Sequence, residues 1–342
     1  MTAADDSLPP FVPAAGLKSG HAQTLAGAFL PSPQLPYRAS AHALELEDGD
    51  LLVLHDDRPS GWQAGDRAAV LVHGLAGSYA SGYMQRITAK LNARGVRVFR
   101  LDLRGCGAGL GRAQHPYHAG RSDDAAAALA FVAQACPGSP ITLVGFSLGG
   151  NIALKLAGEP LAAQCEGLDS VVAVCPPLDL AACAERLQHW SNRPYDRHFV
   201  GLLLKHVARR RRAFPDAPRI ELPRPPRSLY EFDDLLTAPA AGFGDAANYY
   251  RLCSGAQFVA QIKLPTRILA AANDPMIPSD VFANLSPPEN VRVHVAAGGG
   301  HLGFVGRSGC DPDRRWMDWR VVEWIARLPA RNVAAARCGA RT

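Results

Sequence analysis

Short apolar runs that alternate with stretches of helical spacing constrain the fold of this chain more than any other feature of its sequence. The runs in the middle of the chain are almost wholly apolar, which is typical of strands buried on both faces of a parallel sheet. The sequence therefore predicts the α/β class, with helices flanking a mostly parallel central sheet. The predicted strands cover residues 68–73, 96–101, 141–145, 171–175, 267–271 and 291–295, and the predicted helices cover residues 81–94, 123–135, 149–158 and 315–328.

A hairpin pattern precedes this alternation, and an insertion interrupts it. Residues 43–46 and 51–55 flank the turn signal Glu-Asp-Gly-Asp, which predicts an antiparallel hairpin at the sheet edge. After the fourth strand of the series, helical stretches at 180–190 and 197–212 precede a proline-rich stretch and an aromatic segment. Such an insertion lies over the carboxyl ends of the strands, where open α/β sheets bind ligands. We expect an N-terminal arm (1–36), a core (37–176 and 264–342) and a cap insertion (177–263).

Size and charge exclude several functions. The 342 residues leave room for one large α/β domain with an insertion, or for two small domains. The net charge of +5 is mild, and no basic stripe interleaves with aromatic residues, so nucleic acid is not an expected partner. The sequence has no apolar stretch long enough to span a membrane and no signal-peptide pattern, so we expect a cytoplasmic protein without an integral membrane segment. The oligomeric state stays open.

Neither a metal nor an organic cofactor is expected. The eight cysteines are scattered without a Cys-x-x-Cys pair, so zinc-ligand spacing and a disulfide framework are absent and reduced thiols are expected. The glycine-rich stretch at 101–111 follows a strand, as a dinucleotide site does. In the frame that starts at Gly105, however, Leu110 stands where the third glycine is required.

Four arginines at 209–212 close one predicted helix of the insertion. Cations at the end of a helix interact favourably with its dipole, so a solvated helix end is the expected role of this run. Contact with an anionic substrate, or peripheral contact with a membrane surface, is the alternative.

The pentapeptide Gly145-Phe146-Ser147-Leu148-Gly149 carries the strongest chemical signal. It matches the Gly-x-Ser-x-Gly nucleophile elbow, a sharp strand-to-helix turn in which flanking side chains would clash with neighbouring elements. A predicted strand ends at Gly145 and a helix-forming stretch follows at once, as the motif requires. A glycine-rich tight turn without a catalytic serine is the alternative.

A catalytic serine needs a base, and the base needs a carboxylate to orient it. In α/β-hydrolases these residues follow the chain order Ser, Asp or Glu, His. Asp274 follows a predicted strand in a proline-containing loop and is the favoured acid. Asp179 is its competitor, although it precedes a helical stretch and also suits an N-cap. His301 is the expected base, because it follows the last strand and three glycines that permit a tight loop.

An oxyanion hole requires two backbone N–H groups aimed at one point. Leu148, which follows the serine, supplies one. The other is expected from the loop after the strand at 68–73, with Leu75 as the favoured donor and Gly74 as the alternative.

With these residues in place, the chain resembles the YheT-like α/β-hydrolases, a group regarded as esterases whose animal relatives include lipid-hydrolysing members. The resemblance implies the α/β-hydrolase fold and Ser147, Asp274 and His301 as the catalytic triad. It assigns no independent role to His21, Arg104 or His118, which we expect to be structural or to line a pocket. The stretches that carry it are HAQTL (21–25), LVHGLAGS (71–78), LDLRGCG (101–107), YHAG (117–120), LVGFSLGGNIALK (143–155), CPPLDL (175–180), EFDD (231–234), TAP (237–239), NDP (273–275) and GGHLGF (299–304).

The sequence therefore predicts a serine hydrolase that cleaves carboxylic esters through an acyl-enzyme intermediate. The expected partner is a small-molecule ester or a lipid, because hydrophobic residues of the insertion suit an apolar pocket. Two alternatives stay open: an acyltransferase that uses the same nucleophile, and a non-catalytic binding module on a hydrolase scaffold.

Overall fold

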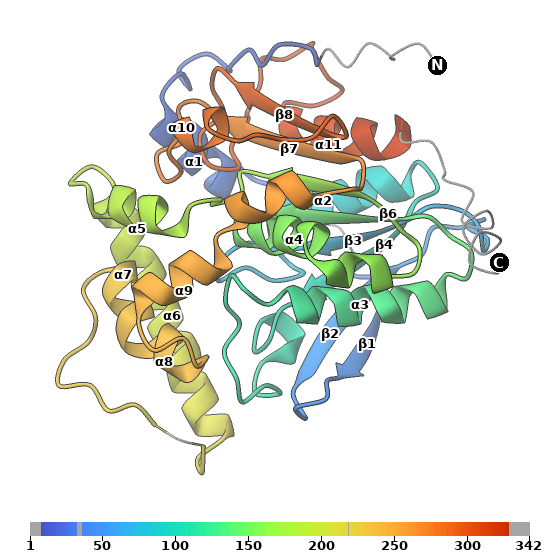
Figure 1. Cartoon of the computed structure of the whole chain (residues 1–342). Coiled ribbons are helices and arrows are strands. Elements are labelled where there is room, and N and C mark those ends of the chain that lie inside the picture. Colours follow the sequence, from blue (N-terminus) through green and yellow to red (C-terminus); the bar gives the residue numbers. More distant parts are fainter. Residues whose placement is uncertain (1–7, 33–35, 218, 328–342) are drawn as a thin grey trace.

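One eight-stranded sheet forms the centre of the computed structural model, which describes residues 8–32, 36–217 and 219–327 (Figure 1). Its strands are β1 (Ser40–Glu45), β2 (Leu51–Asp57), β3 (Ala68–Val72), β4 (Arg97–Asp102), β5 (Ile141–Phe146), β6 (Leu168–Val174), β7 (Thr266–Ala271) and β8 (Val291–Ala296). They lie in the order β1-β2-β4-β3-β5-β6-β7-β8. The β1–β2 pair is the predicted antiparallel edge hairpin, β2 pairs antiparallel with β4, and the other pairs are parallel. Every residue of β3, β4 and β5 is buried, as their apolar runs predict.

Helices cover both faces of the sheet, which confirms the predicted α/β class. On one face α2 (Gly82–Asn92) packs against α11 (Trp316–Arg327), and on the other α3 (Ser122–Ala135) packs against α4 (Leu148–Gly158) (Figure 1). Within the described part of the chain, no helix has both the length and the apolar character needed to cross a membrane.

The chain between β6 and β7 forms a mostly helical insertion, whose helices lie together on one side of the molecule in Figure 1. It begins with α5 (Leu180–Gln188) and the long α6 (Arg193–Ala213), close to the predicted bounds. The aromatic segment that follows the proline-rich stretch also folds into helical turns, which are too short for periodicity to reveal. These are α7 (Leu229–Phe232), the π-helical turn η3 (Asp233–Thr237), α8 (Ala238–Ala240) and α9 (Ala246–Cys253).

The sequence pattern did not predict α1 (Gly20–Phe29), a helix near the N-terminus. The helix packs directly against the loop that follows β7. The two backbones are so close that a Cβ on Gly20 would fall on the carbonyl oxygen of Asn273. Glycine at this position allows the close approach of the two backbones, but it also weakens the helical signal of the stretch.

The turn between β5 and α4 packs so tightly that its two glycines have no room for a side chain. A Cβ on Gly145 would overlap the backbone of Gly149, and a Cβ on Gly149 would fall on the carbonyl oxygen of Val72 in β3. Between them, Ser147 has a φ of 50°, in the left-handed region that residues with a side chain seldom adopt. The contact of β5, α4 and β3 therefore holds a strained serine at the carboxyl end of β5.

Replacing Gly149 by alanine is expected to lower the free energy of unfolding by at least about 2 kcal/mol, because the new Cβ meets backbone atoms of a buried strand. Gly201→Ala is the matched control. Gly201 lies within α6 with nothing within 4 Å of an added Cβ, so alanine there should raise stability by about 0.5–1 kcal/mol. Urea unfolding measures both changes, and equal effects at the two positions would contradict the packing described for the turn.

Candidate active site

Ser147 lies next to His301, a residue 154 positions further along the chain. The serine Oγ is 2.9 Å from Nε2 of His301. On the other side of the imidazole ring, Nδ1 is 2.8 Å from Oδ2 of Asp274. An ionised carboxylate only accepts hydrogen bonds, so Nδ1 carries the proton and Nε2 accepts the hydroxyl proton of Ser147. The structure thus brings together the three residues predicted as a triad.

The loop after β7 fixes the Asp274 carboxylate. Its second oxygen, Oδ1, accepts the backbone N–H groups of Met276 at 2.8 Å and Ile277 at 3.1 Å, and the side chain is buried. The competing acid, Asp179, caps α5 instead and accepts the N–H of Ala182 at 3.0 Å. Asp274, and not Asp179, is therefore the carboxylate in contact with His301.

The N-terminal helix α1 supports the loop that carries His301. Thr24 Oγ1 accepts the backbone N–H of His301 at 2.9 Å, and the side chain of Asn273 accepts the N–H of Gly300 at 3.0 Å. Gly300 has a φ of 58°, and a Cβ there would overlap Gly20 and Thr24. Sequence reasoning missed this support, although the HAQTL stretch in which Thr24 stands was among the quoted motifs.

The backbone N–H groups of Leu148 and Leu75, both near Ser147, have no acceptor among the described residues. The first opens α4 directly after the serine. The loop of the second lies close by, since a Cβ on Gly74 would be 3.0 Å from Cβ of Ser147. The alternative donor, Gly74, gives its own N–H to the hydroxyl of Tyr83 at 3.0 Å.

Ser147 and His301 line a pocket to which both the sheet and the insertion contribute. Most of its lining is apolar, and the aliphatic part includes Leu75, Leu148, Leu180, Leu187, Leu203, Met276 and Ile277. Its polar part includes Arg104, His115, Tyr117, His118, His206, Arg210, Asp233, Tyr249 and Tyr250.

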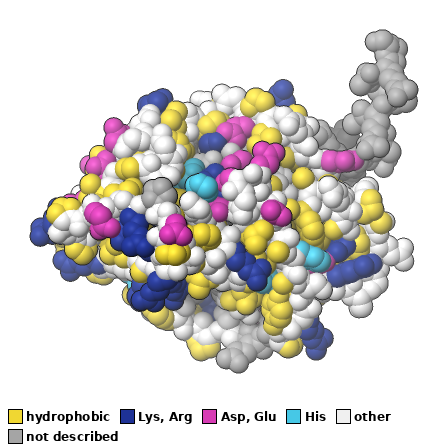
Figure 2. Space-filling model, turned by 90° about the horizontal axis from the view of Figure 1, so that it is seen from below, with side chains coloured by type: hydrophobic (Ala, Val, Ile, Leu, Met, Phe, Trp, Pro, Cys, Tyr) yellow, Lys and Arg dark blue, Asp and Glu magenta, His cyan; other side chains and the backbone are white. Residues whose placement is uncertain are grey.

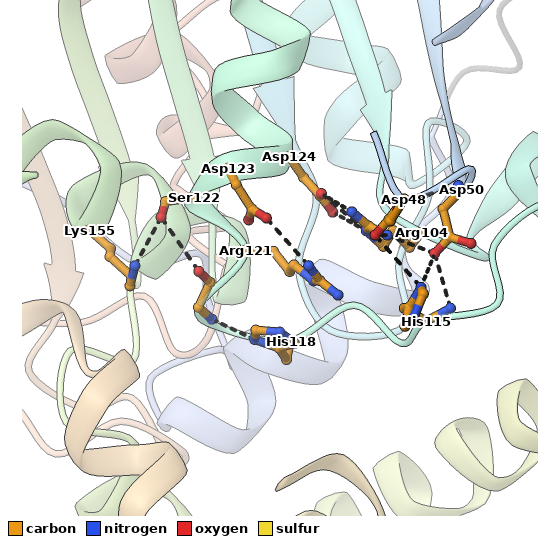
Figure 3. Close-up of polar contacts among 11 residues, drawn as sticks. Asp48, Asp50, Arg104, His115, His118, Arg121, Ser122, Asp123, Asp124 and Lys155 are labelled. Carbon is orange, nitrogen blue, oxygen red and sulfur yellow. Dashed lines mark hydrogen bonds and ion pairs between the residues drawn. The ribbon is translucent and has the colours of Figure 1, made fainter. Parts of the chain in front are cut away.

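His118 lines this pocket as a neutral imidazole. Burial, and then the positive charges of Arg121, Arg104 and Lys155, lower the pKa of His118 to about 3. The N–H of Gly120 donates to Nδ1 at 3.1 Å, so the ring proton is on Nε2 (Figure 3). His118 is therefore a fixed hydrogen-bond donor at the pocket wall.

Arg104 is the centre of an ion-pair cluster at the edge of the pocket (Figure 3). Its guanidinium donates to Asp124 at 2.8 Å and to Asp50 at 2.7 Å, and it also binds Asp48. Burial lowers the pKa of Arg104, but the hydrogen bonds with the three carboxylates outweigh burial and raise it. The cluster joins the β1–β2 turn to α3, which is the structural role expected for this arginine.

His21 has a structural contact as well. Its Nδ1 lies 3.1 Å from the hydroxyl of Tyr195, and the two rings are stacked with their centroids 5.7 Å apart. This pair connects α1 to α6, so the N-terminal arm touches the insertion.

Two groups of side chains place metal-ligating atoms close together in the described residues. In the first, Cys175 lies beside Asp274 and His301, but those two residues already bind each other. Burial and the neighbouring carboxylate raise the pKa of the Cys175 thiol, which disfavours the thiolate a metal would need. The second group, Asp48, Asp50 and His115, already surrounds the Arg104 guanidinium, so its oxygens are occupied by a cation.

An open, mostly parallel sheet with a strained serine at the turn after a central strand defines the class of α/β-hydrolases. The alpha/beta hydrolase fold family matches residues 69–307 of the chain. The chain belongs to this family, as its resemblance to the YheT-like α/β-hydrolases predicted.

Individual proteins extend the comparison. The chain is 32% identical over 320 residues to "Putative esterase YheT" of Escherichia coli K12, an alignment that covers 92% of each chain. It is 24% identical to "Medium-chain fatty acid ethyl ester synthase/esterase 2" of Saccharomyces cerevisiae, over 76% of this chain and 62% of that protein. Among solved structures, the esterase Pf2001 of Pyrococcus furiosus superposes with a TM-score of 0.55 at 16% identity, covering 87% of this chain and 98% of the other.

A buried carboxyl group that sequence reasoning missed, Asp233, also lines the pocket. It opens the π-helical turn, and the hydroxyl of Tyr250 donates to its Oδ2 at 2.8 Å. Burial raises the pKa of Asp233 to about 6, against the opposing effect of hydrogen bonds from Thr237 and Tyr250. The EFDD motif at 231–234 was the signal that could have identified it.

Asp233→Asn is expected to change stability in a pH-dependent way. Because the pKa is higher in the folded protein than in the unfolded chain, ionisation of Asp233 destabilises the native state as the pH rises from about 4 to about 6 and above. Asparagine cannot ionise, so the stability of the variant relative to wild type, as the difference in free energy of unfolding, should be about 1–2 kcal/mol greater at pH 8 than at pH 5. Urea unfolding at both pH values measures this difference, and a difference that does not change with pH would contradict the raised pKa.

Proposed function

We propose that the chain is a serine esterase that hydrolyses carboxylic esters with apolar acyl groups. The observation that carries this proposal is the hydrogen-bonded series from Ser147 through His301 to Asp274, with distances of 2.9 and 2.8 Å. Family membership and esterase-named relatives support the same reaction class.

In the first step, Oγ of Ser147 attacks the ester carbonyl carbon while Nε2 of His301 takes the hydroxyl proton. The N–H groups of Leu148 and Leu75 stabilise the oxyanion that forms, which is consistent with their lack of a protein acceptor. The bond between the carbonyl carbon and the alcohol oxygen then breaks. His301 returns the proton to this oxygen, the alcohol leaves, and Ser147 remains acylated.

In the second step, water attacks the acyl-enzyme as His301 takes one of its protons. The carboxylic acid leaves and the proton returns to Oγ of Ser147, so the enzyme is regenerated without a cofactor. Asp274 keeps the imidazole ring in the same orientation throughout and stabilises its charged form.

The proposed domain division supports this chemistry. Residues 177–263 act as a cap on the core formed by 37–176 and 264–342, and the arm at 1–36 supports the His301 loop through Thr24. The cap contributes aliphatic side chains of α5 and α6 to the pocket, which suits an apolar acyl chain. A small-molecule ester or a lipid is therefore the substrate class that we propose.

Ser147→Ala and Asp274→Asn should each lower kcat/KM for a short-chain 4-nitrophenyl ester by at least about 1,000-fold, because one removes the nucleophile and the other removes the acceptor that orients His301. Asp179→Asn is the matched control. Asparagine also serves as an N-cap, so its kcat/KM should remain within about threefold of wild type. If Asp179→Asn alone lost activity, the assignment of Asp274 as the catalytic acid would be wrong.

Labelling by a fluorophosphonate probe separates an enzyme from a binding module. The probe should modify wild-type protein at Ser147 and leave Ser147→Ala unlabelled. Absence of both labelling and ester turnover in folded protein would contradict the proposed activity.

Acyl transfer is the second candidate, because the yeast relative is named as both a synthase and an esterase. With a 4-nitrophenyl octanoate substrate and added ethanol, we expect free octanoic acid to account for all the 4-nitrophenol released. A shortfall of acid matched by ethyl octanoate, measured by mass spectrometry, would instead show that the acyl-enzyme prefers an alcohol to water.

A further inference from the structure

Arg210 occupies a boundary position on α6. It lines the pocket that contains Ser147 and also an adjoining basin, and the two cavities share His115, Pro116, Val207 and Arg210. The outer members of the arginine run, Arg209 and Arg212, have the solvated positions expected for a helix end, whereas Arg210 is half-buried. Of the four arginines at 209–212, Arg210 is therefore the one placed to contact a ligand in the pocket that contains Ser147.

Within the described residues, the Arg210 guanidinium has no hydrogen bond and no ion pair. Burial and the neighbouring charge of Arg211 lower the pKa of Arg210, and Asp50 opposes them. The Asp50 carboxylate is already engaged, because it accepts hydrogen bonds from Arg104 at 2.7 Å and from the backbone of Gln114 at 2.6 Å. A guanidinium stays charged in proteins, so a partly desolvated one without a partner carries an unmet cost.

Most of the well-buried arginines of the core have carboxylate partners, and Arg315 instead donates to the backbone carbonyl oxygens of Leu30 and Pro31. Arg86 pairs with Asp318 at 2.8 Å, and the other pairs are Arg97 with Asp56, Arg100 with Asp57 and Arg104 with Asp124. Against this pattern, the unpaired cation at the pocket wall points to a partner that the protein itself does not supply.

The adjoining basin is also lined by positively charged side chains other than Arg210. Arg211 and Arg219 line it, and each donates to a backbone carbonyl oxygen, that of Ile220 or Pro215. No aspartate or glutamate is among the described residues that line this basin. Viewed from below in Figure 2, Lys and Arg side chains gather on the side of the molecule formed by the insertion.

We propose that Arg210 binds an anionic group of the ester substrate, a carboxylate or a phosphate, separated from the ester carbonyl by an apolar segment. This inference rests on the proposed esterase function. A guanidinium binds either anion through two parallel N–H donors, and the aliphatic lining of the pocket that Arg210 shares with Ser147 suits the apolar segment. Asp233, the carboxyl group of the same pocket, is held by Tyr250 and forms no ion pair with Arg210.

Two matched pairs of esters test the proposal and distinguish the two anions. The first compares mono-4-nitrophenyl suberate, whose acyl chain ends in a carboxylate, with its neutral methyl ester. The second compares the 4-nitrophenyl ester of 8-(phosphonooxy)octanoic acid, whose acyl chain ends in a phosphate, with its neutral dimethyl phosphate ester. For at least one pair, the wild-type ratio of kcat/KM, anionic over neutral, should be at least about ten, as expected for a charge-assisted hydrogen-bonded pair.

Arg210→Gln should lower that ratio at least about tenfold, and Arg210→Lys should restore part of it because the charge returns without the planar donor pair. Arg212→Gln, an exposed position on the same helix, should keep the wild-type ratio. A wild-type ratio near one for both pairs, or a ratio that Arg210→Gln leaves unchanged, overturns the proposal. In the second case, weaker sedimentation of Arg210→Gln with phosphatidylglycerol vesicles would assign the arginine to a membrane surface.

These outcomes are distinct from failure of the esterase function itself. If wild-type protein hydrolyses neutral esters and shows no anion preference, only the role of Arg210 is wrong. If no ester is hydrolysed and Ser147 is not labelled by a fluorophosphonate, the proposed function fails and the inference fails with it.

Discussion

The contact of three backbones at the turn between β5 and α4 is the constraint on which the candidate active site depends. Gly145 and Gly149 let α4 approach β5 and β3 until no side chain fits between them, and Ser147 is strained as a consequence. The turn presents Oγ at the carboxyl end of β5, and the loops that begin at the same ends of β7 and β8 carry Asp274 and His301. Since parallel strands end at the same edge, one tight turn is enough to bring residues from three distant segments within hydrogen-bond reach.

Charge is distributed very differently on the two sides of the pocket. On the side of the sheet, arginines are paired with buried carboxylates, and the Arg104 cluster holds the β1–β2 turn and α3 together. On the side of the insertion, Arg210 has no such partner among the described residues. Most buried cations of the core are compensated by carboxylates of the protein, whereas Arg210 at the pocket wall is left to solvent or to a bound anion.

Local patterns predicted a large part of the fold and the residues of the site, whereas long-range contacts did not follow from them. The apolar runs identified the core strands, and the order of Ser147, Asp274 and His301 follows from the strands that precede them. The sequence favoured Asp274 over Asp179 only by its loop, because both residues follow a strand; in three dimensions Asp274 contacts His301, whereas Asp179 caps α5. Periodicity describes local structure and cannot show which distant segments meet. It therefore predicted neither helix α1 nor the π-helical turn, and it could not show that Arg210 lacks a partner.

The hydrogen bond from His301 to Thr24 has a consequence for how the protein is made. The two residues are 277 positions apart, so the loop that carries His301 is completed only when nearly the whole chain is present. Contacts of such high sequence separation form late in folding, after the entropy of closing a long loop has been overcome. During synthesis, Ser147 is made long before His301, so the hydrogen-bonded series from Ser147 to Asp274 cannot form until the segment after β8 has been translated.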